Sequence, residues 1–413
     1  MIKTGSFSKI ISLLLCVFTL AFSLSSCGKK DIIATYTADG KDYTVTEKEF
    51  DFFMKYRKYE YFYSSYISAK YDTADFWSTK IDDGNTIDKT LTDSVIRTAK
   101  TVAVEKYLMD KYGLTLDEAD VKKAKEDSKT AEKNYGGAGA FKKYWGYTGD
   151  DYYEYQLSVL RSKKVYDYLF SDAGSLVLDD GQLEEYYKEH YKQYQFILIN
   201  TKKKIATDDE GNKQYLVYDE SGNSVYVTDI SKEFLEEKKY TLGYNYKYED
   251  LTDEEKEKKS TLAEELIAQL KNGADFKELA VANSDNFYSS YYPNGLIVDG
   301  DLVNDEKVIE ALKDLEIGSY TDAISVSSGD YIYIIKRVEL KEKAYKDAEE
   351  NAEDKEYAEL FKDYIDTVKS SKYSNYLEEL CASVVTNDAI INKYNMTKTY
   401  LSQAIRERDN YYN

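Results

Sequence analysis

The stretch Thr252–Lys336 constrains the fold of this chain more than any other part of the sequence. Thr252 and Glu255 form a capping-box pair that starts a helix, and Gly273 is well placed to end that helix. Between them, leucines recur every four positions, which predicts one apolar stripe. Asp275 then caps a second, short helix, and the stretch closes on the β-rich segment Tyr331–Lys336. The pattern predicts two helices that share a domain with at least one strand.

Several motifs occur in a fixed order in this region. They are G-A-D-F-K-E-L-A from Gly273, Ser284-Asp285, Asn294-Gly295-Leu296, A-L-K-D-L-E-I-G from Ala311 and Y-I-Y-I-I-K from Tyr331. This order resembles a parvulin-type peptidyl-prolyl isomerase domain, with Tyr194–Asn200 as its first strand. The resemblance implies an α+β domain over residues 194–340, built from a small antiparallel sheet with flanking helices.

Residues 201–258 follow the expected first strand and form a β-rich insertion. Gln214–Tyr218 and Ser224–Thr228 alternate as strands around a Ser-Gly-Asn turn, which predicts a hairpin. Lys232–Tyr240 predicts a short helix, and Tyr244–Asp250 is interpreted as a loop. A surface decoration is favoured over a client-binding arm for this insertion.

The flanks of the expected parvulin-like domain are rich in helical patterns. A strand pair within Asp31–Val45 is followed by helices with apolar stripes, and more helical sequence follows residue 341. This layout is similar to the PrsA-like and SurA-like extracytoplasmic foldases, in which a C-terminal helix completes the N-terminal helices. The resemblance implies a mostly helical chaperone domain made of residues 27–193 and 341–413, with C-terminal helices at Glu342–Ser370 and Tyr373–Val385.

The first residues have the pattern of an export signal. Lys3 and Lys9 precede an apolar run over Ile10–Leu24, and the following Ser-Ser-Cys27 resembles a bacterial lipobox. The resemblance implies that residues 1–26 are a cleaved lipoprotein signal peptide and that Cys27 is lipidated. An uncleaved membrane helix is the alternative, but the run is short for a span, which needs roughly 20 apolar residues. Cys381 is then the one expected free thiol, so no internal disulfide is expected.

Charge and residue counts exclude several function classes. The chain of 413 residues has 56 Lys and Arg against 76 Asp and Glu, a net charge of −20 that argues against a nucleic-acid partner. Its single histidine, His190, lies on a predicted helix over residues 182–193 and is interpreted as a solvated helix residue. One histidine and one free thiol argue against a zinc site, and the sequence has no phosphate-binding loop or nucleophile elbow. We expect no cofactor and no metal.

The parvulin resemblance also assigns site positions. The first-strand histidine of the family falls at Phe196, its cysteine or aspartate at Asn286 and its last-strand histidine at Tyr333. Substrate contact is expected from Phe196, Tyr333, Leu198 and Leu312. Because both histidine positions are substituted, the resemblance implies weak or lost isomerase activity. Phe196, Asn286 and Tyr333 are expected to form a water-poor pocket without the family's polar network.

The favoured function is that of a lipid-anchored folding factor on the extracytoplasmic face of the bacterial membrane, where it binds unfolded exported polypeptides. The 44 tyrosines suit such binding, for example within Tyr56–Tyr66, because tyrosine gives a large amphipathic contact. Packing of tyrosine in protein cores explains the same count equally well. One alternative is an active isomerase of the same fold. Another is a solute- or cell-wall-binding lipoprotein, which would predict paired α/β lobes with repeated βαβ units.

Overall fold

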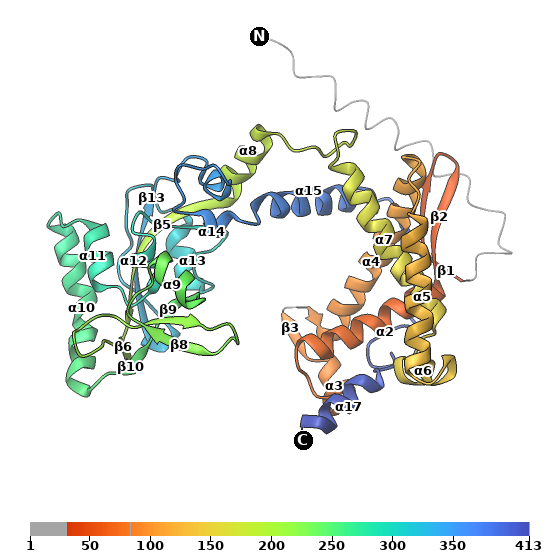
Figure 1. The fold of residues 1–413 in the computed structure, drawn as a ribbon, viewed down its shortest axis with the longest axis horizontal. Helices are drawn as coiled ribbons and strands as arrows, with labels where there is room; N and C mark the ends of the chain where they lie inside the picture. The colour runs from red at the N-terminus through yellow and green to blue at the C-terminus, as the bar shows by residue number, and fades with distance from the viewer. Residues whose placement is uncertain (1–30, 83, 413) are drawn as a thin grey trace, which may run out of the picture. The chain divides into compact units, whose positions relative to one another are not determined.

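The computed structural model describes residues 31–82 and 84–412, which form two compact units (Figure 1). The first, here called the N/C unit, joins the chain up to Val177 with the segment from Ser370 onward. The second, here called the central unit, is the continuous segment Leu178–Lys369. Small antiparallel sheets and many helices make up both units, which confirms the expected α+β class. The expected signal peptide 1–26 and Cys27 lie outside the described residues.

Local capping signals start several helices of the N/C unit. In α2 (Glu47–Ser64), the backbone N–H of Glu49 donates to Thr46 Oγ1 at 3.2 Å, and the N–H of Thr46 donates to Glu49 Oε2 at 2.8 Å. The further described helices of this unit are η1 (Ala69–Tyr71), α3 (Ala74–Trp77), α4 (Ile87–Lys111), α5 (Glu118–Asn134), α6 (Ala138–Trp145), α7 (Gly149–Leu169), the later turns of α15 (Tyr364–Cys381), α16 (Asp388–Ile391) and α17 (Gln403–Tyr412).

A three-stranded sheet joins the two ends of the N/C unit. Strands β1 (Ile32–Ala38) and β2 (Lys41–Thr46) form the expected hairpin, turning at Asp39 and Gly40, which both have positive φ. Strand β14 (Val385–Thr386) then pairs antiparallel with the other edge of β1. A short hairpin of β3 (Lys80–Asp82) and β4 (Asn85–Thr86) lies apart from this sheet. The C-terminal segment therefore supplies one strand of the N-terminal sheet.

The core of the N/C unit mixes side chains from both of its segments. Helix α4 buries one stripe, which includes Leu91, Val95 and Ala99. The C-terminal segment adds a further set of buried apolar side chains to the same cluster: Leu377, Cys381, Val384, Ile390, Ile391, Met396, Leu401 and Ile405. Because these residues pack with α2 and α4, the two segments share a single hydrophobic core.

A buried lysine also holds the C-terminal segment. The side chain of Lys58 on α2 is 0% exposed, and its Nζ donates to the carbonyl oxygens of Met396 and Thr399, both at 2.7 Å. The same Nζ lies 2.7 Å from Asp72 Oδ1 and 5.2 Å from the ring centroid of Trp77. An ammonium group removed from water is tolerated only with such a full set of partners. Lys58 therefore ties α2 to the chain beyond α16.

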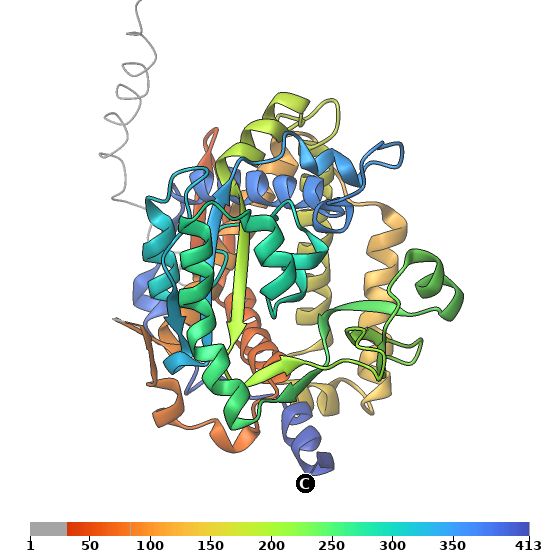
Figure 2. The same cartoon turned by 90° about the vertical axis from the view of Figure 1, so that its left-hand side faces the viewer.

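The central unit is organised around the long strand β5 (Tyr191–Asn200). It lies inside a four-stranded antiparallel sheet with the order β11 (Leu296–Asp299), β5, β13 (Tyr331–Val338) and β12 (Ile324–Val326). One face of β5 and β13 packs under α10 (Asp253–Lys271) and α11 (Phe276–Asn283), as Figure 2 shows. The other face packs under α13 (Glu306–Lys313). Further helices of this unit are α8 (Asp180–His190), α12 (Phe287–Tyr291), η2 (Ser327–Gly329), η3 (Ala344–Ala348) and α14 (Ala358–Phe361).

The insertion 201–258 forms its own small β layer within the central unit. Strands β6 (Lys203–Ile205) and β10 (Tyr248–Asp250) pair with each other. The sheet order of the rest is β8 (Ser224–Val227), β7 (Tyr215–Tyr218) and β9 (Thr241–Tyr246). Helix α9 (Lys232–Lys238) matches the expected short helix. The interpretation of Tyr244–Asp250 as a loop is wrong, since this segment forms the end of β9 and all of β10.

The expected helix over Glu342–Ser370 is also wrong. The chain makes the short helices η3 and α14 there, and α15 then runs without a break through Ser370. The reason is packing: Tyr345, Phe361 and Tyr364 lie around Tyr187 in a core of the central unit. Residues 178–193 and 341–369 therefore group with the central unit, so its boundaries differ from the expected 194–340. No helix among the described residues is long and apolar enough to cross a membrane.

Candidate functional site

Phe196, Leu198 and Tyr333 lie on one face of the central sheet. In the antiparallel register, Phe196 pairs with Ile335 and Leu198 pairs with Tyr333. Paired residues on neighbouring strands, and residues two positions apart, point to the same face. Phe196 is 4% exposed, and Leu198 is also buried. The register therefore brings the two expected histidine positions to one face, two residues apart.

Helix α13 closes that face with apolar side chains. Phe196 and Leu312 belong to one buried cluster, which also contains Val308, and Tyr333 packs against it half-buried. Burial raises the pKa of the Tyr333 hydroxyl, so this group stays a neutral phenol at physiological pH. The cluster is buried and apolar, and Phe196 adds no hydrogen-bonding group to it.

Asn286, the third expected site residue, caps a helix. It is the N-cap of α12, and its Oδ1 accepts a hydrogen bond from the backbone N–H of Tyr288 at 2.9 Å. Its own N–H donates to Ser284 Oγ at 3.3 Å. Both hydrogen bonds of Asn286 are therefore made with its own chain segment, at the start of α12. The side chain is used to start a helix, as asparagine commonly does.

Two buried serines next to Asn286 hold the edge of β5. Ser284 Oγ accepts from the N–H of Leu198 at 3.0 Å, and Ser289 Oγ donates to the carbonyl of Phe196 at 2.7 Å. The two hydroxyl oxygens are 2.9 Å apart. This pair satisfies strand groups that no neighbouring strand reaches, because β11 pairs only with the first part of β5.

Asp285 completes the same edge. Its backbone N–H donates to the carbonyl of Leu198 at 2.7 Å, and its Oδ2 accepts from the N–H of Asn200 at 2.9 Å. The carboxylate is buried and forms an ion pair with Lys259 of α10. The Ser-Asp motif was noticed in the sequence as a family marker, but its hydrogen-bonding role needs the distant strand and was missed.

The insertion packs against the same segment through tyrosines. Tyr246 Oη lies 2.6 Å from Ser290 Oγ, and Tyr248 Oη donates to the carbonyl of Asp285 at 2.8 Å. The ring of Tyr244 stacks on Tyr288 with centroids 6.0 Å apart, and Tyr288 also packs against the cluster around Phe196. Tyr244, Tyr246 and Tyr248 alternate in the sequence, a strand signal that could have revealed this layer.

His190 lies on α8, outside the elements that form the cluster around Phe196. His190 ends α8, and its ring stacks on Tyr186 with centroids 4.0 Å apart. It is the single histidine of the chain. Within residues 31–82 and 84–412, no group of three or more His, Cys, Asp and Glu side chains is placed to hold a metal ion.

The geometry of the central unit agrees with a family match. Residues 243–341 match the family model of the PPIC-type PPIase domain. The central unit contains a parvulin-type domain. The matched stretch starts in β9 and ends just after β13, so it omits β5. The structure adds that strand to the parvulin-type domain, because β5 pairs with β13 over Gln193–Asn200.

Solved structures of PrsA proteins are similar to this chain at low identity. The PrsA structure from Bacillus subtilis shares 17% identity and a TM-score of 0.21, covering 71% of this chain and 83% of that one. Foldase protein PrsA from Streptococcus pneumoniae shares 16% and 0.23, covering 81% and 99%. Peptidylprolyl isomerase PrsA from Bacillus cereus shares 16% and 0.26, covering 74% and 90%. No curated protein matches the sequence. The assignment of the parvulin-type domain therefore rests on the family match.

Proposed function

We propose that this protein is a membrane-anchored, extracytoplasmic folding factor that binds unfolded exported polypeptides, with weak or lost isomerase activity in its parvulin-type domain. The observation that supports the second part most is the burial of Phe196 in an apolar cluster, at the position where the family carries a histidine. The proposal assigns Phe196, Leu198, Leu312 and Tyr333 to contact with apolar segments of clients. It gives Asn286 no catalytic task, because its side-chain oxygen caps α12.

The chemistry of prolyl isomerisation explains why this substitution matters. Rotation about the X-Pro bond is slow because the amide has partial double-bond character, and a catalyst must bind the twisted amide better than the planar one. A polar network beneath the proline site helps by tuning the groups that contact the amide. Phenylalanine can neither donate nor accept a hydrogen bond. An apolar cluster that lacks this network favours binding of apolar segments over turnover.

Exposed tyrosines in the N/C unit support polypeptide binding. Tyr63 is 57% exposed, Tyr66 is 84% exposed and Tyr71 is 50% exposed. Tyr63 lies in the last turn of α2, Tyr66 follows that helix, and Tyr71 ends η1. Large aromatic rings that remain in water are suited to bind partners, since each offers apolar area with a polar tip. Many other tyrosines are buried in the two cores, so burial and exposure both account for the high tyrosine count.

The substitution Tyr333→Phe tests the proposed loss of catalysis. We expect the full chain to suppress aggregation of reduced lysozyme, and we expect Tyr333→Phe to change this suppression by less than about twofold. The physical reason is that the half-buried ring keeps its apolar contacts, and the hydroxyl group alone is worth roughly 1 kcal/mol. Light scattering during lysozyme refolding gives the measurement.

Isomerisation of an Ala-Leu-Pro-Phe peptide, followed by exchange spectroscopy, is the companion assay for the same variant. We expect exchange at the uncatalysed rate for both proteins. Catalysis by the wild-type chain that disappears in Tyr333→Phe would contradict the proposal and establish an active isomerase. The variant Leu312→Ala is the matched control, because it opens the apolar cluster and should weaken suppression.

The anchor part of the proposal is tested at Cys27. We expect Cys27→Ser to remain unprocessed or to appear in the medium, because serine offers no thiolate for diacylglycerol transfer. Membrane fractionation with metabolic labelling by a radioactive fatty acid measures both outcomes. Cys381→Ser is the matched control and should leave labelling unchanged. Membrane retention of a processed Cys27→Ser protein would argue against a lipid anchor at this residue.

A further inference from the structure

Strand β8 is the outermost strand of the sheet in the insertion. Among the described strands it pairs only with β7, so its other side, here called the β8 edge (Ser224–Val227), has no strand beside it. Two other edge strands are protected. The carbonyl of Ser325 in β12 accepts from Lys307 Nζ at 3.0 Å. Strand β2 carries the charges of Lys41 and Asp42. The β8 edge has the sequence Ser-Val-Tyr-Val, with no charge and no proline, so it is open to pairing with another extended chain.

The register of the hairpin formed by β7 and β8 decides which backbone groups of β8 are free. The N–H of Asp219 donates to the carbonyl of Asn223 at 3.0 Å, so these two residues bond across the hairpin. Bonding residues alternate along an antiparallel ladder, and Val225 is the next one to bond to β7. The N–H and C=O groups of Ser224 and Tyr226 therefore point away from β7. An extended chain laid along the β8 edge can bond to both residues.

Exposed aromatic side chains lie beside these backbone groups. Tyr226 is 47% exposed and Tyr218 is 37% exposed. The two lie on one face of the sheet, because Tyr226 pairs with Leu216 and Tyr218 is two residues further along β7. Every second side chain of an added strand would lie on this face. Contacts of aromatic rings with β-branched residues on the neighbouring strand stabilise such pairs.

Charge limits which extended chain can pair with the β8 edge. Residues 206–229, which form the hairpin and the turn before it, contain one basic residue, Lys213, and six acidic residues: Asp208, Asp209, Glu210, Asp219, Glu220 and Asp229. Two further lysines lie nearby, Lys239 at 3.1 Å from Glu220 and Lys247 at 5.7 Å from the ring centroid of Tyr226. Six acidic residues still exceed three basic ones. This excess repels a second copy of the same hairpin and favours a segment with basic side chains.

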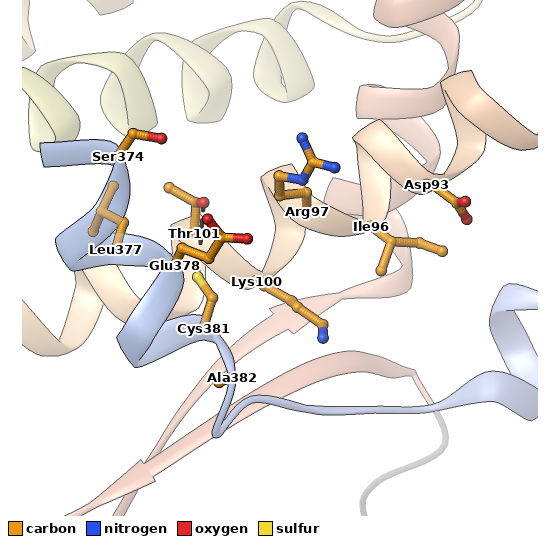
Figure 3. Close-up of a pocket in the computed structure, with 10 residues that line it drawn as sticks. All are labelled: Asp93, Ile96, Arg97, Lys100, Thr101, Ser374, Leu377, Glu378, Cys381 and Ala382. Carbon is orange, nitrogen blue, oxygen red and sulfur yellow. Dashed lines mark hydrogen bonds between the residues drawn. The ribbon is translucent and has the colours of Figure 1, made fainter. Parts of the chain in front are cut away.

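A cavity of the N/C unit offers no comparable preference. It measures about 470 Å³ and lies between α4 and the later turns of α15 (Figure 3). Asp93 and Glu378 line it together with Arg97 and Lys100, so its charges are balanced. Charge therefore gives a basic segment no reason to enter this cavity rather than to bind the β8 edge.

We propose that the β8 edge binds extended segments of unfolded polypeptides by strand addition, with a preference for β-branched residues flanked by basic ones. The backbone groups of Ser224 and Tyr226 bond to the segment, and the rings of Tyr218 and Tyr226 contact its alternate side chains. This inference rests on the proposed function as a polypeptide-binding factor. It assigns the insertion 201–258 the role of a client-binding arm rather than a surface decoration.

The first test changes the protein. Two fluorescein-labelled peptides, in which valine and threonine alternate between terminal lysines or terminal glutamates, are titrated with the full chain. Fluorescence anisotropy gives the dissociation constants, and we expect the lysine peptide to bind more tightly. Tyr226→Pro removes an outward N–H and blocks the edge, so it should weaken binding at least about tenfold. Tyr226→Thr is the matched control, which keeps the N–H and should weaken binding less than about threefold. Equal binding by wild type and Tyr226→Pro would overturn the inference, and equal binding of the two peptides would overturn the preference for basic segments.

The second test changes the peptide and leaves the protein intact. Methylation of the backbone nitrogen at every second residue removes the hydrogen-bond donors from one edge of an extended peptide, and methylation of the alternate set removes them from the other edge. Strand addition uses a single edge of the bound segment. We therefore expect one methylated lysine peptide to bind like the unmodified peptide and the other to bind at least about tenfold more weakly. Equal affinities of the two methylated peptides would overturn the inference.

Cross-linking locates the peptide directly. A benzophenone in place of one valine should attach the lysine peptide to residues 214–228. Attachment to residues 93–101 or 374–382, which include the lining of the balanced cavity, would overturn the inference. Sedimentation tests the second copy as occupant: a dimer that Tyr226→Pro dissociates would also overturn it. Circular dichroism checks that this variant is folded.

Suppression of lysozyme aggregation separates this inference from the proposed function. If the chain suppresses aggregation but the peptide does not bind at the β8 edge, the proposed function stands and the edge assignment alone fails. If the peptide binds at the β8 edge and suppression is absent, the site stands and the proposed function fails.

Discussion

Truncation of the chain after Lys369 is expected to unfold the N/C unit and to leave the central unit folded. The deletion removes β14 from the sheet and removes the apolar side chains that the C-terminal segment adds to the core. Full burial of one such side chain contributes about 1.5–3 kcal/mol. Their sum is at least comparable with the net stability of about 5–15 kcal/mol that a domain usually has. Residues 31–177 should therefore not keep a native core alone.

Both tryptophans of the chain report on this unit. Trp77 is buried in its core, and Trp145 packs against that core, whereas the central unit has no tryptophan. We expect the emission of the truncated chain to shift to the wavelength of solvent-exposed indole. Limited proteolysis with mass spectrometry should cut within residues 31–177 and spare residues 178–369. Native emission together with protease resistance of residues 31–177 would show that the N-terminal segment folds independently.

Lys58→Met is expected to destabilise the N/C unit by about 3–5 kcal/mol. The substitution removes the ammonium group and keeps most of the apolar volume. It leaves the carbonyl groups of Met396 and Thr399 without this donor and takes away the cation that faces Asp72. Because the uncompensated groups lie inside the protein, water cannot replace the lost bonds without opening the structure. Urea unfolding monitored by tryptophan emission measures the change in this unit alone.

A surface lysine provides the control for this experiment. Lys163 on α7 pairs with Asp167 one helical turn away, and both side chains are more than half exposed. Lys163→Met should change the free energy of unfolding by less than about 1 kcal/mol, as is usual for exposed ion pairs. Equal effects of the two substitutions would mean that Lys58 is not the link between α2 and the C-terminal segment.

Local signals predicted the starts of elements well. The capping box at Thr252 and the cap at Asp275 are present with their expected hydrogen bonds. These signals act within one helical turn, so the residues that form them are close in the sequence and can be recognised there. Ends of elements that depend on distant partners were predicted less well.

The failures over residues 341–370 have a common physical cause. Lys341 Nζ lies 2.7 Å from both Asp347 and Asp354, which closes a loop where a continuous helix was expected. Tyr357 Oη donates to the carbonyl of Gly295 at 2.8 Å, so this segment is held by the parvulin-type domain. Helical periodicity gives no information on such contacts, since they join residues far apart in the sequence.

At the candidate site, too, local motifs were predicted better than contacts between distant segments. Motif order was enough to place Phe196, Leu312 and Tyr333, and the structure brings these three into one cluster. Asn286 was assigned to the site by alignment, whereas its position before a short helix makes it a cap. The hydrogen bonds of Ser284 and Ser289 to β5 were missed because they depend on which strand lies beside them. Whether these positions contact clients stays a prediction.

The pairing of β1 with β14 also limits the order in which the N/C unit can fold during the proposed export. A chain that leaves a translocon N-terminus first presents β1 and β2 long before β14 has emerged. The central unit is continuous and can close in the meantime, but the N/C unit must wait with one sheet edge unpaired and its core incomplete. In the export proposed above, the N/C unit would complete its fold only after its C-terminal segment has emerged.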